Sequence, residues 1–150
     1  MNDIATNVGE VSYTRVFDAP RTLVFRCMTT PEHLTHFWGP VGTSTPLERI
    51  TIDARPGGAF ETTMVDDASG AEYPNEGTYV TVDEPETLAF IEEGSGMLTT
   101  STFADLGDGR TEVTIHQTNV PMMYLSPEAE AGFRSSLDRL DAHLATLTGR

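Results

Sequence analysis

The chain has 150 residues, of which 38% are hydrophobic, and its formal net charge is −14. This length suits one globular domain, and the acidic surface repels phosphate backbones and anionic lipids, which argues against nucleic-acid and membrane partners. No stretch approaches the roughly 20 apolar residues that a membrane-spanning helix needs. The polar stretch 1–10 lacks the apolar core of a secretion signal, and the single cysteine, Cys27, forms no internal disulfide. We therefore expect a cytoplasmic location.

The N-terminal part of the chain predicts one strand followed by two short helices. Apolar and polar residues alternate over 11–17, which favours a strand, and residues 1–10 before it are expected to be flexible. Pro20 suits the first turn of a helix, with apolar residues following at helical spacing. Thr30 is a good N-cap for a second short helix.

The middle of the chain predicts a series of strands. Turns rich in glycine, proline and aspartate separate the apolar segments, and strands joined by such short turns pair antiparallel. Together with the first strand they would form a seven-stranded sheet. The six strands are expected at 47–53, 59–65, 77–82, 87–92, 97–104 and 111–118.

The last predicted element is a helix of roughly 21 residues, or about 31 Å at 1.5 Å per residue. Ser126 is its expected N-cap, Pro127 suits its first position, and Gly149 suits its C-terminal stop. Such a helix needs a broad surface to lie against, and the predicted sheet provides one. Apolar residues at spacings of four, three, four and three form one stripe along it: Phe133, Leu137, Leu140, Leu144 and Leu147.

Five short motifs occur in this order: Phe17-Asp18-Ala19-Pro20, the decapeptide 31–40, Asp53-Ala54-Arg55-Pro56-Gly57-Gly58, Glu84-Pro85-Glu86-Thr87-Leu88 and Ser136-Leu137-Asp138-Arg139-Leu140. As a set they resemble the START/Bet v1-like (SRPBCC) superfamily, and within it the branch related to the activator of Hsp90 ATPase (AHSA1-like). Each motif alone is weak, but the set and its order are specific for the fold.

The resemblance implies an α+β helix-grip fold, with one domain over 11–150. In it a seven-stranded curved antiparallel sheet wraps round the long C-terminal helix, and two short helices lie between strands 1 and 2. Members of the superfamily commonly enclose an apolar cavity between sheet and helix. Their roles include lipid or hormone binding, polyketide cyclisation and co-chaperone activity, so the fold alone does not select a function.

Two positions depart from the family pattern. Several relatives carry a tryptophan near the start of the last helix, where this chain has Phe133, and an aromatic residue where it has Glu92. Smaller aromatic walls and an added carboxylate would make an open pocket roomier and more polar.

Strand alternation predicts which side chains face the helix. The inward set is mostly apolar with a few polar groups, which is typical of a small-molecule site, although the same residues could pack as a solid core. The expected ligand-binding residues are Phe37, Trp38, Phe60, Met64, Phe90, Glu92, Phe103, Ile115, Gln117, Phe133 and Leu137.

Glu92 is the most informative polar residue among them. A carboxylate in an apolar cavity has a raised pKa and can act as an acid or base. Because Glu92 stands near the end of a predicted strand beside Glu93, it could instead be solvated.

The histidines do not form a recognisable metal motif. His33 and His36 lie three apart on a short helix, but a third ligand is not apparent from spacing, so they are expected on the surface. His116 and His143 are expected to face solvent, and Cys27 reads as a small buried hydrophobe. We expect neither a metal ion nor a cofactor.

Three functions remain open from the sequence. The first is binding, without catalysis, of a small hydrophobic ligand in a cavity between sheet and C-terminal helix. The second is an enzyme like a polyketide cyclase or dehydratase, with Glu92, Gln117 and Tyr79 as the residues to test. The third is an interaction module acting on an Hsp90-type ATPase. A homodimer is compatible with any of them.

Overall fold

The strands that come first and last in the sequence are neighbours in the sheet. The computed structural model describes residues 8–149. In it β1 (Val8–Phe17) pairs antiparallel with β8 (Thr111–Pro121), from Val8 opposite Pro121 to Phe17 opposite Thr111. The described residues form an eight-stranded sheet in the order β1-β8-β7-β6-β5-β4-β2, with β3 also paired to β4.

The other elements connect these strands. The 3₁₀ helices carry the label η. In chain order the elements are α1 (Arg21–Thr29), α2 (Pro31–Leu34), β2 (Thr43–Ser44), η2 (Leu47–Arg49), β3 (Thr51–Ile52), β4 (Ala59–Asp66), β5 (Glu72–Asp83), β6 (Thr87–Glu92), β7 (Leu98–Asp105), η3 (Met122–Leu125) and α3 (Pro127–Thr148).

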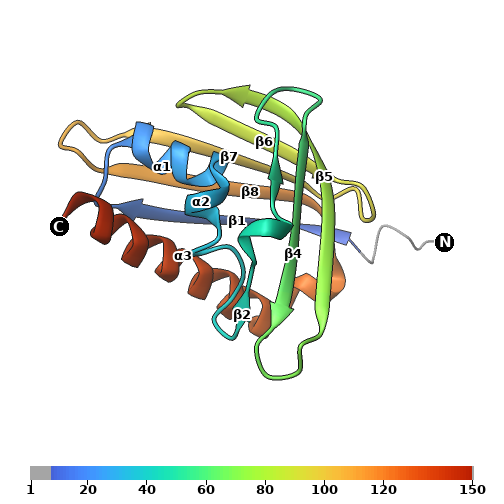
Figure 1. The fold of residues 1–150 in the computed structure, drawn as a ribbon. Helices are drawn as coiled ribbons and strands as arrows, with labels where there is room; N and C mark the ends of the chain where they lie inside the picture. The colour runs from blue at the N-terminus through green and yellow to red at the C-terminus, as the bar shows by residue number, and fades with distance from the viewer. Residues whose placement is uncertain (1–7, 150) are drawn as a thin grey trace.

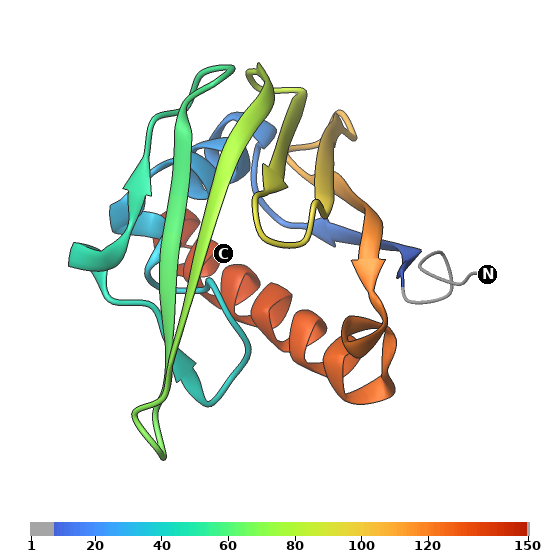
Figure 2. The ribbon, with the colours of Figure 1, turned by 90° about the vertical axis from the view of Figure 1, so that its right-hand side faces the viewer.

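The sheet curves round the long helix α3, which confirms the predicted helix-grip fold (Figures 1 and 2). α1 and α2 follow β1 directly and lie at one end of the sheet (Figure 1). Phe25 of α1 packs edge-on against Phe103 of β7, with ring centroids 5.2 Å apart. The core therefore lies between the curved sheet and three helices. None of the helices in residues 8–149 is long and apolar enough to cross a membrane.

The predicted strand over 47–53 is largely wrong, and the sheet has eight strands in its described part where seven were expected. Leu47–Arg49 forms a 3₁₀ turn because its backbone bonds locally, with Arg49 N donating to Pro46 O at 2.9 Å. Only Thr51–Ile52 of this segment pairs with β4. The short strand Thr43–Ser44, which was not predicted, extends the sheet edge beyond β4.

Two strands are longer than their patterns indicate. β5 starts at Glu72, five residues before the predicted start, because its hairpin with β4 continues to the pair Val65 and Glu72. β1 starts at Val8, three residues before the predicted start, and Val8 and Gly9 pair with β8 ahead of a register shift between Gly9 and Val11. Residues 1–7 of the segment expected to be flexible lie outside the described residues.

The long helix has the predicted ends. Ser126 Oγ accepts a hydrogen bond from Ala129 N at 3.1 Å, and Gly149 adopts the left-handed conformation, with φ 74°, that glycine tolerates best. Leu137, Leu140 and Leu144 are buried, but Leu147 is 42% exposed. The apolar stripe thus ends one turn earlier than expected, because the last turn of α3 lies at the edge of the core.

The second short helix differs from its prediction. Thr30 occupies the N-cap position of α2, but its side chain makes no capping hydrogen bond. α2 ends at Leu34, so Phe37 and Trp38 lie in the turn that follows it. Backbone bonds from Phe37 N and Trp38 N to Leu34 O, at 3.1 and 3.0 Å, hold that turn.

Candidate functional site

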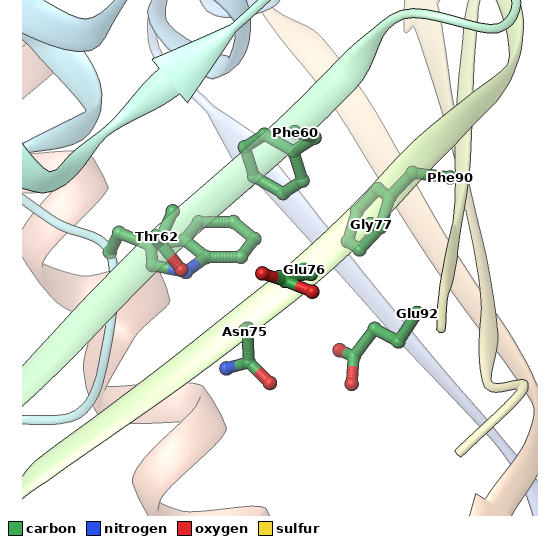
Figure 3. Close-up of a pocket in the computed structure, with 8 residues that line it drawn as sticks. Phe60, Thr62, Asn75, Glu76, Gly77, Phe90 and Glu92 are labelled. Atoms are coloured by element: carbon green, nitrogen blue, oxygen red, sulfur yellow. The ribbon is translucent and has the colours of Figure 1, made fainter. Parts of the chain in front are cut away.

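A small pocket lies where β4, β5 and β6 meet the turn after α2 (Figure 3). Phe60 of β4 lies opposite Gly77 of β5 in the sheet register. Gly77 in turn lies opposite Glu92 of β6. The sheet register therefore brings residues from three strands together. The pocket is lined by Trp38, Phe60, Thr62, Asn75, Glu76, Gly77, Phe90 and Glu92.

Three aromatic rings form the apolar wall of the pocket. The ring centroids of Phe60 and Phe90 are 4.7 Å apart, and those of Trp38 and Phe60 are 5.2 Å apart, both in edge-on geometry. Such arrangements are favoured because a positive ring edge meets a negative ring face. The three rings come from β4, β6 and the turn after α2, so the wall exists only in the folded chain.

Gly77 makes room for this wall. A Cβ atom at this position would lie 3.1 Å from Ile91 O, 3.2 Å from Phe60 O and 3.5 Å from the Phe90 ring. A side chain here would press on the backbone of both neighbouring strands and on the Phe90 ring. Glycine is thus the residue that lets the two phenylalanines approach each other across β5.

The polar part of the pocket is on its other side. Figure 3 shows the side chains of Asn75 and Glu92 on the side away from the Phe60 ring. Glu92 is half-buried, and burial raises the pKa of its carboxyl group. Glu92 is the last residue of β6 and also lines the pocket.

The pocket is small in this structure. The space open to the centre of a water molecule is about 10 Å³, which is room for about one water. Sites for drug-sized ligands measure about 300–1,000 Å³. At this place the structure corresponds to the alternative of a packed core, because the aromatic rings pack against one another and fill most of the space.

Four predicted site residues line this pocket: Trp38, Phe60, Phe90 and Glu92. Four others belong to the buried core: Phe37, Phe103, Ile115 and Leu137. Met64 lies against Gly39, and Gln117 Nε2 donates to Thr99 Oγ1 at 3.2 Å. Phe133 stacks on Tyr13 of β1. The structure thus separates the predicted set into one pocket and several packing contacts.

Three pocket residues on β5 were missed, namely Asn75, Glu76 and Gly77. The predicted strand began at residue 77, whereas β5 starts at Glu72. Pro74 is a residue type that argues against a strand, so the sequence pattern did not indicate this earlier start. The signal that could have found two of them is the spacing of two from Asn75 to Gly77 and on to Tyr79, which places all three on one face.

Tyr79, a candidate of the enzyme hypothesis, is buried beside this wall. Its ring centroid lies 5.5 Å from that of Phe60. Its hydroxyl has no hydrogen-bond partner among the described residues, and burial, with a smaller effect of Asp53, raises its pKa far above the usual value. A buried unpaired hydroxyl is costly, so a water or ligand that reached it would gain a hydrogen bond.

The histidines are arranged differently from the prediction. His143, expected to face solvent, is half-buried, and its Nε2 lies 3.0 Å from His33 Nδ1. The ring of His36 stacks on that of His143, with centroids 4.5 Å apart. His36 is exposed as expected, and His116 on β8 is partly exposed and contacts Glu10.

Comparisons with known proteins agree with this fold. A protein of Chromobacterium violaceum is 28% identical, with 89% of this chain and 96% of that chain covered and a TM-score of 0.80. A protein of Rhodobacter sphaeroides is 17% identical over 93% and 97% of the two chains, with a TM-score of 0.82. An AHSA1-like protein of Aeromonas hydrophila is 18% identical over 93% and 94%, with a TM-score of 0.79. No curated protein matches the sequence.

The family profile described as activator of Hsp90 ATPase homolog 1-like protein matches residues 18–145, which is most of the chain. The predicted resemblance is thereby confirmed. The chain belongs to the AHSA1-like family of the START/Bet v1-like superfamily.

Proposed function

We propose that this protein binds a small, largely apolar molecule in the pocket formed by Trp38, Phe60, Phe90 and Glu92. One observation carries the proposal. The aromatic rings of Trp38, Phe60 and Phe90 come from separate elements and line one pocket, and the Glu92 carboxyl group and the Asn75 amide lie at its side. An apolar wall with a few polar groups is typical of small-molecule sites. The shared fold of the superfamily supports the same class of function.

Binding requires the pocket to open, because its present volume holds about one water. Trp38 is the pocket residue whose side chain is best placed to move. It lies in a turn outside helix and strand and is half-buried, whereas Phe60 and Phe90 are held by the strands β4 and β6. Displacing the indole would add the volume of its ring to the pocket. The ligand then replaces the apolar contacts that the indole gave up.

The polar side of the pocket suggests one feature of the ligand. Glu92 and Asn75 are hydrogen-bonding groups beside an apolar wall. A ligand with one donor, such as a hydroxyl or an amine, would pair with the Glu92 carboxylate and still bury its apolar body. A fully anionic ligand would be repelled by Glu92 and by the acidic surface.

Trp38 makes the test direct because it is the single tryptophan of the chain. N-phenyl-1-naphthylamine, a neutral probe with one N–H donor, should accept energy from Trp38. We expect saturable transfer with one probe per chain. Thr62 is buried in the pocket, so Thr62→Leu should fill the space and weaken binding by at least about 10-fold, the effect of about 1.4 kcal/mol.

The matched control is Thr102→Leu, the same substitution at an exposed position on the outer face of β7. It should bind the probe as the unmodified chain does. Circular dichroism of both variants verifies that they are folded. Absence of saturable transfer, or equal affinity of Thr62→Leu and the unmodified chain, would refute the proposed binding site.

An acid–base enzyme is the second candidate, and the raised pKa of the Glu92 carboxyl group favours it. Native mass spectrometry of freshly purified protein would identify a co-purified molecule as the starting substrate. If Glu92 transfers a proton, Glu92→Gln should bind that molecule and convert it about 10²–10⁴-fold more slowly. If the unmodified chain binds the co-purified molecule but does not convert it, the enzyme hypothesis is wrong and the binding function stands.

A further inference from the structure

Three metal-ligating side chains, none of which lines the pocket, meet where the three helices come together. They are Cys27 of α1, His33 of α2 and His143 of α3, and one potential ligand atom of each lies within 4.8 Å of the other two. Cys27 is fully buried, whereas both imidazoles are half-buried. The thiol therefore forms the base of the cluster, and the two rings stand between it and solvent.

This donor set suits a particular class of metal ion. Thiolate sulfur and imidazole nitrogen are ligands of Zn²⁺, which takes four ligands in a tetrahedron, whereas Mg²⁺ and Ca²⁺ prefer oxygen. Two nitrogens about 2.05 Å from a tetrahedral zinc are about 3.3 Å apart. His33 Nδ1 and His143 Nε2 are already 3.0 Å apart, so they need to separate by only a few tenths of an ångström.

We propose that Cys27, His33 and His143 form a zinc site, with a water molecule as the fourth ligand. The proposal does not depend on the function proposed for the pocket. The His36 ring stacks on His143 at an interplanar angle of 13°, which fixes the orientation of that imidazole. We assign no metal bond to His36, because its ring lies parallel to that of His143 and not beside the thiol.

Zinc binding would change the protonation of its ligands. Burial and the neighbouring His36 and His33 lower the pKa of His143. Burial raises the pKa of the Cys27 thiol to about 11, opposed by nearby Arg26. Zinc binding would release the thiol proton to solvent. The imidazole that donates the His33–His143 hydrogen bond would carry its proton on the other ring nitrogen instead, so that both facing nitrogens bind zinc.

A bound zinc ion would cross-link three helices. His33 and His143 are 110 positions apart in the sequence, and Cys27 adds the third helix. The ion would fasten the C-terminal half of α3 to α1 and α2. Because the folded chain alone assembles the three ligands, zinc should raise the midpoint of thermal unfolding.

The test uses the full-length chain without an affinity tag, first stripped with a chelator. One equivalent of Co²⁺ serves as the spectroscopic substitute for Zn²⁺. We expect thiolate-to-cobalt charge-transfer absorption, the strong visible bands of a tetrahedral site, and displacement of both by one equivalent of Zn²⁺. Weak octahedral bands without charge transfer would contradict the proposal, since they indicate carboxylate and water ligands on the acidic surface.

Variants identify the ligands. Cys27→Ala should abolish the charge-transfer band, and His143→Phe, which keeps a ring against His36, should weaken Zn²⁺ binding in calorimetry by at least about 10-fold. His36→Phe is the matched control and should retain both binding and spectrum. The proposal fails if Cys27→Ala binds Zn²⁺ as tightly as the unmodified chain, or if His36→Phe loses the metal while His143→Phe keeps it.

Discussion

The ring of Phe133 stacks on the ring of Tyr13, with centroids 4.2 Å apart and planes inclined by 14°. This contact joins α3 to β1, and the Arg134 guanidinium also lies over the Tyr13 ring, 5.3 Å from its centroid. Phe133 was expected to face a ligand. In this structure it instead attaches the N-terminal half of the helix to the sheet, away from the residues that line the pocket.

The stacked pair should contribute its own coupling energy. In a double-mutant cycle with Tyr13→Leu and Phe133→Leu, we expect a coupling of about 0.5–1.5 kcal/mol, because offset aromatic pairs are worth that much beyond the area they bury. Urea unfolding followed by far-ultraviolet circular dichroism measures it. Losses that add within about 0.3 kcal/mol would show that the rings stabilise the fold only through burial.

The core face of α3 should end before Leu147. Leu140 is fully buried, so Leu140→Ala should lower the free energy of unfolding by about 2–5 kcal/mol through lost burial and the cavity left behind. Leu147→Ala is the same change at a residue that is 42% exposed, and its cost should stay within about 0.5 kcal/mol. Equal costs in urea titrations would contradict the observed end of the stripe.

Arg139 should hold the loop between α2 and β2. Its Nη1 donates to Gly39 O, Pro40 O and Thr43 O at 2.9, 3.2 and 3.2 Å. Arg139→Met leaves these carbonyls without that donor, so we expect a loss of about 1–3 kcal/mol and faster amide exchange over residues 39–44.

The control for this prediction is Arg110→Met. Arg110 pairs with Asp108 in an exposed hairpin, where an ion pair contributes under about 1 kcal/mol. Amide exchange over residues 39–44 in the Arg110→Met variant should match that of the unmodified chain. Exchange unchanged in Arg139→Met would mean that the three hydrogen bonds do not restrain the loop.

Glu92 should make stability depend on pH in a defined direction. Burial raises the pKa of its carboxyl group in the folded state, so the protonated form stabilises the fold. This contribution is complete below the unfolded pKa of about 4.3 and is lost as pH rises through the folded pKa. Glu92→Gln lacks the charge and should therefore gain stability relative to the unmodified chain between pH 4 and pH 7.

Urea unfolding of both proteins across that pH range measures the difference in the free energy of unfolding. Only the difference between the two proteins matters, because the other carboxylates titrate equally in both. A difference that does not change with pH would mean that the Glu92 carboxyl group is as well solvated in the folded chain as in the unfolded one.

Local patterns predicted the regular elements well. The strand predicted at 87–92 coincides with β6, and Ser126 and Gly149 mark the ends of α3 as expected. Alternation and helix caps act between residues close in sequence, so they can be recognised without the fold. The strand predicted over 47–53 failed because the backbone of η2 satisfies its hydrogen bonds locally, which residue type alone did not reveal.

The pocket was only partly predictable. The alternation of β4 and β6 placed Phe60, Phe90 and Glu92 on inward faces, and all three line the pocket. Asn75 and Gly77 were missed because the start of β5 depends on its pairing with β4. A helix stripe likewise identifies the side of α3 that is covered, but not which strand or loop covers each residue.

By itself the sequence determined most element types and the inward faces of two pocket strands, because periodicity, caps and turns are encoded locally. The ordered set of short motifs carried the resemblance to the helix-grip family. Only the tertiary structure decided that the aromatic rings fill their own pocket, and that Cys27, His33 and His143 meet. Those three residues come from three helices, and their spacing in the sequence matches no metal-binding motif. They become neighbours only when α3, the last helix of the chain, packs beside the first two.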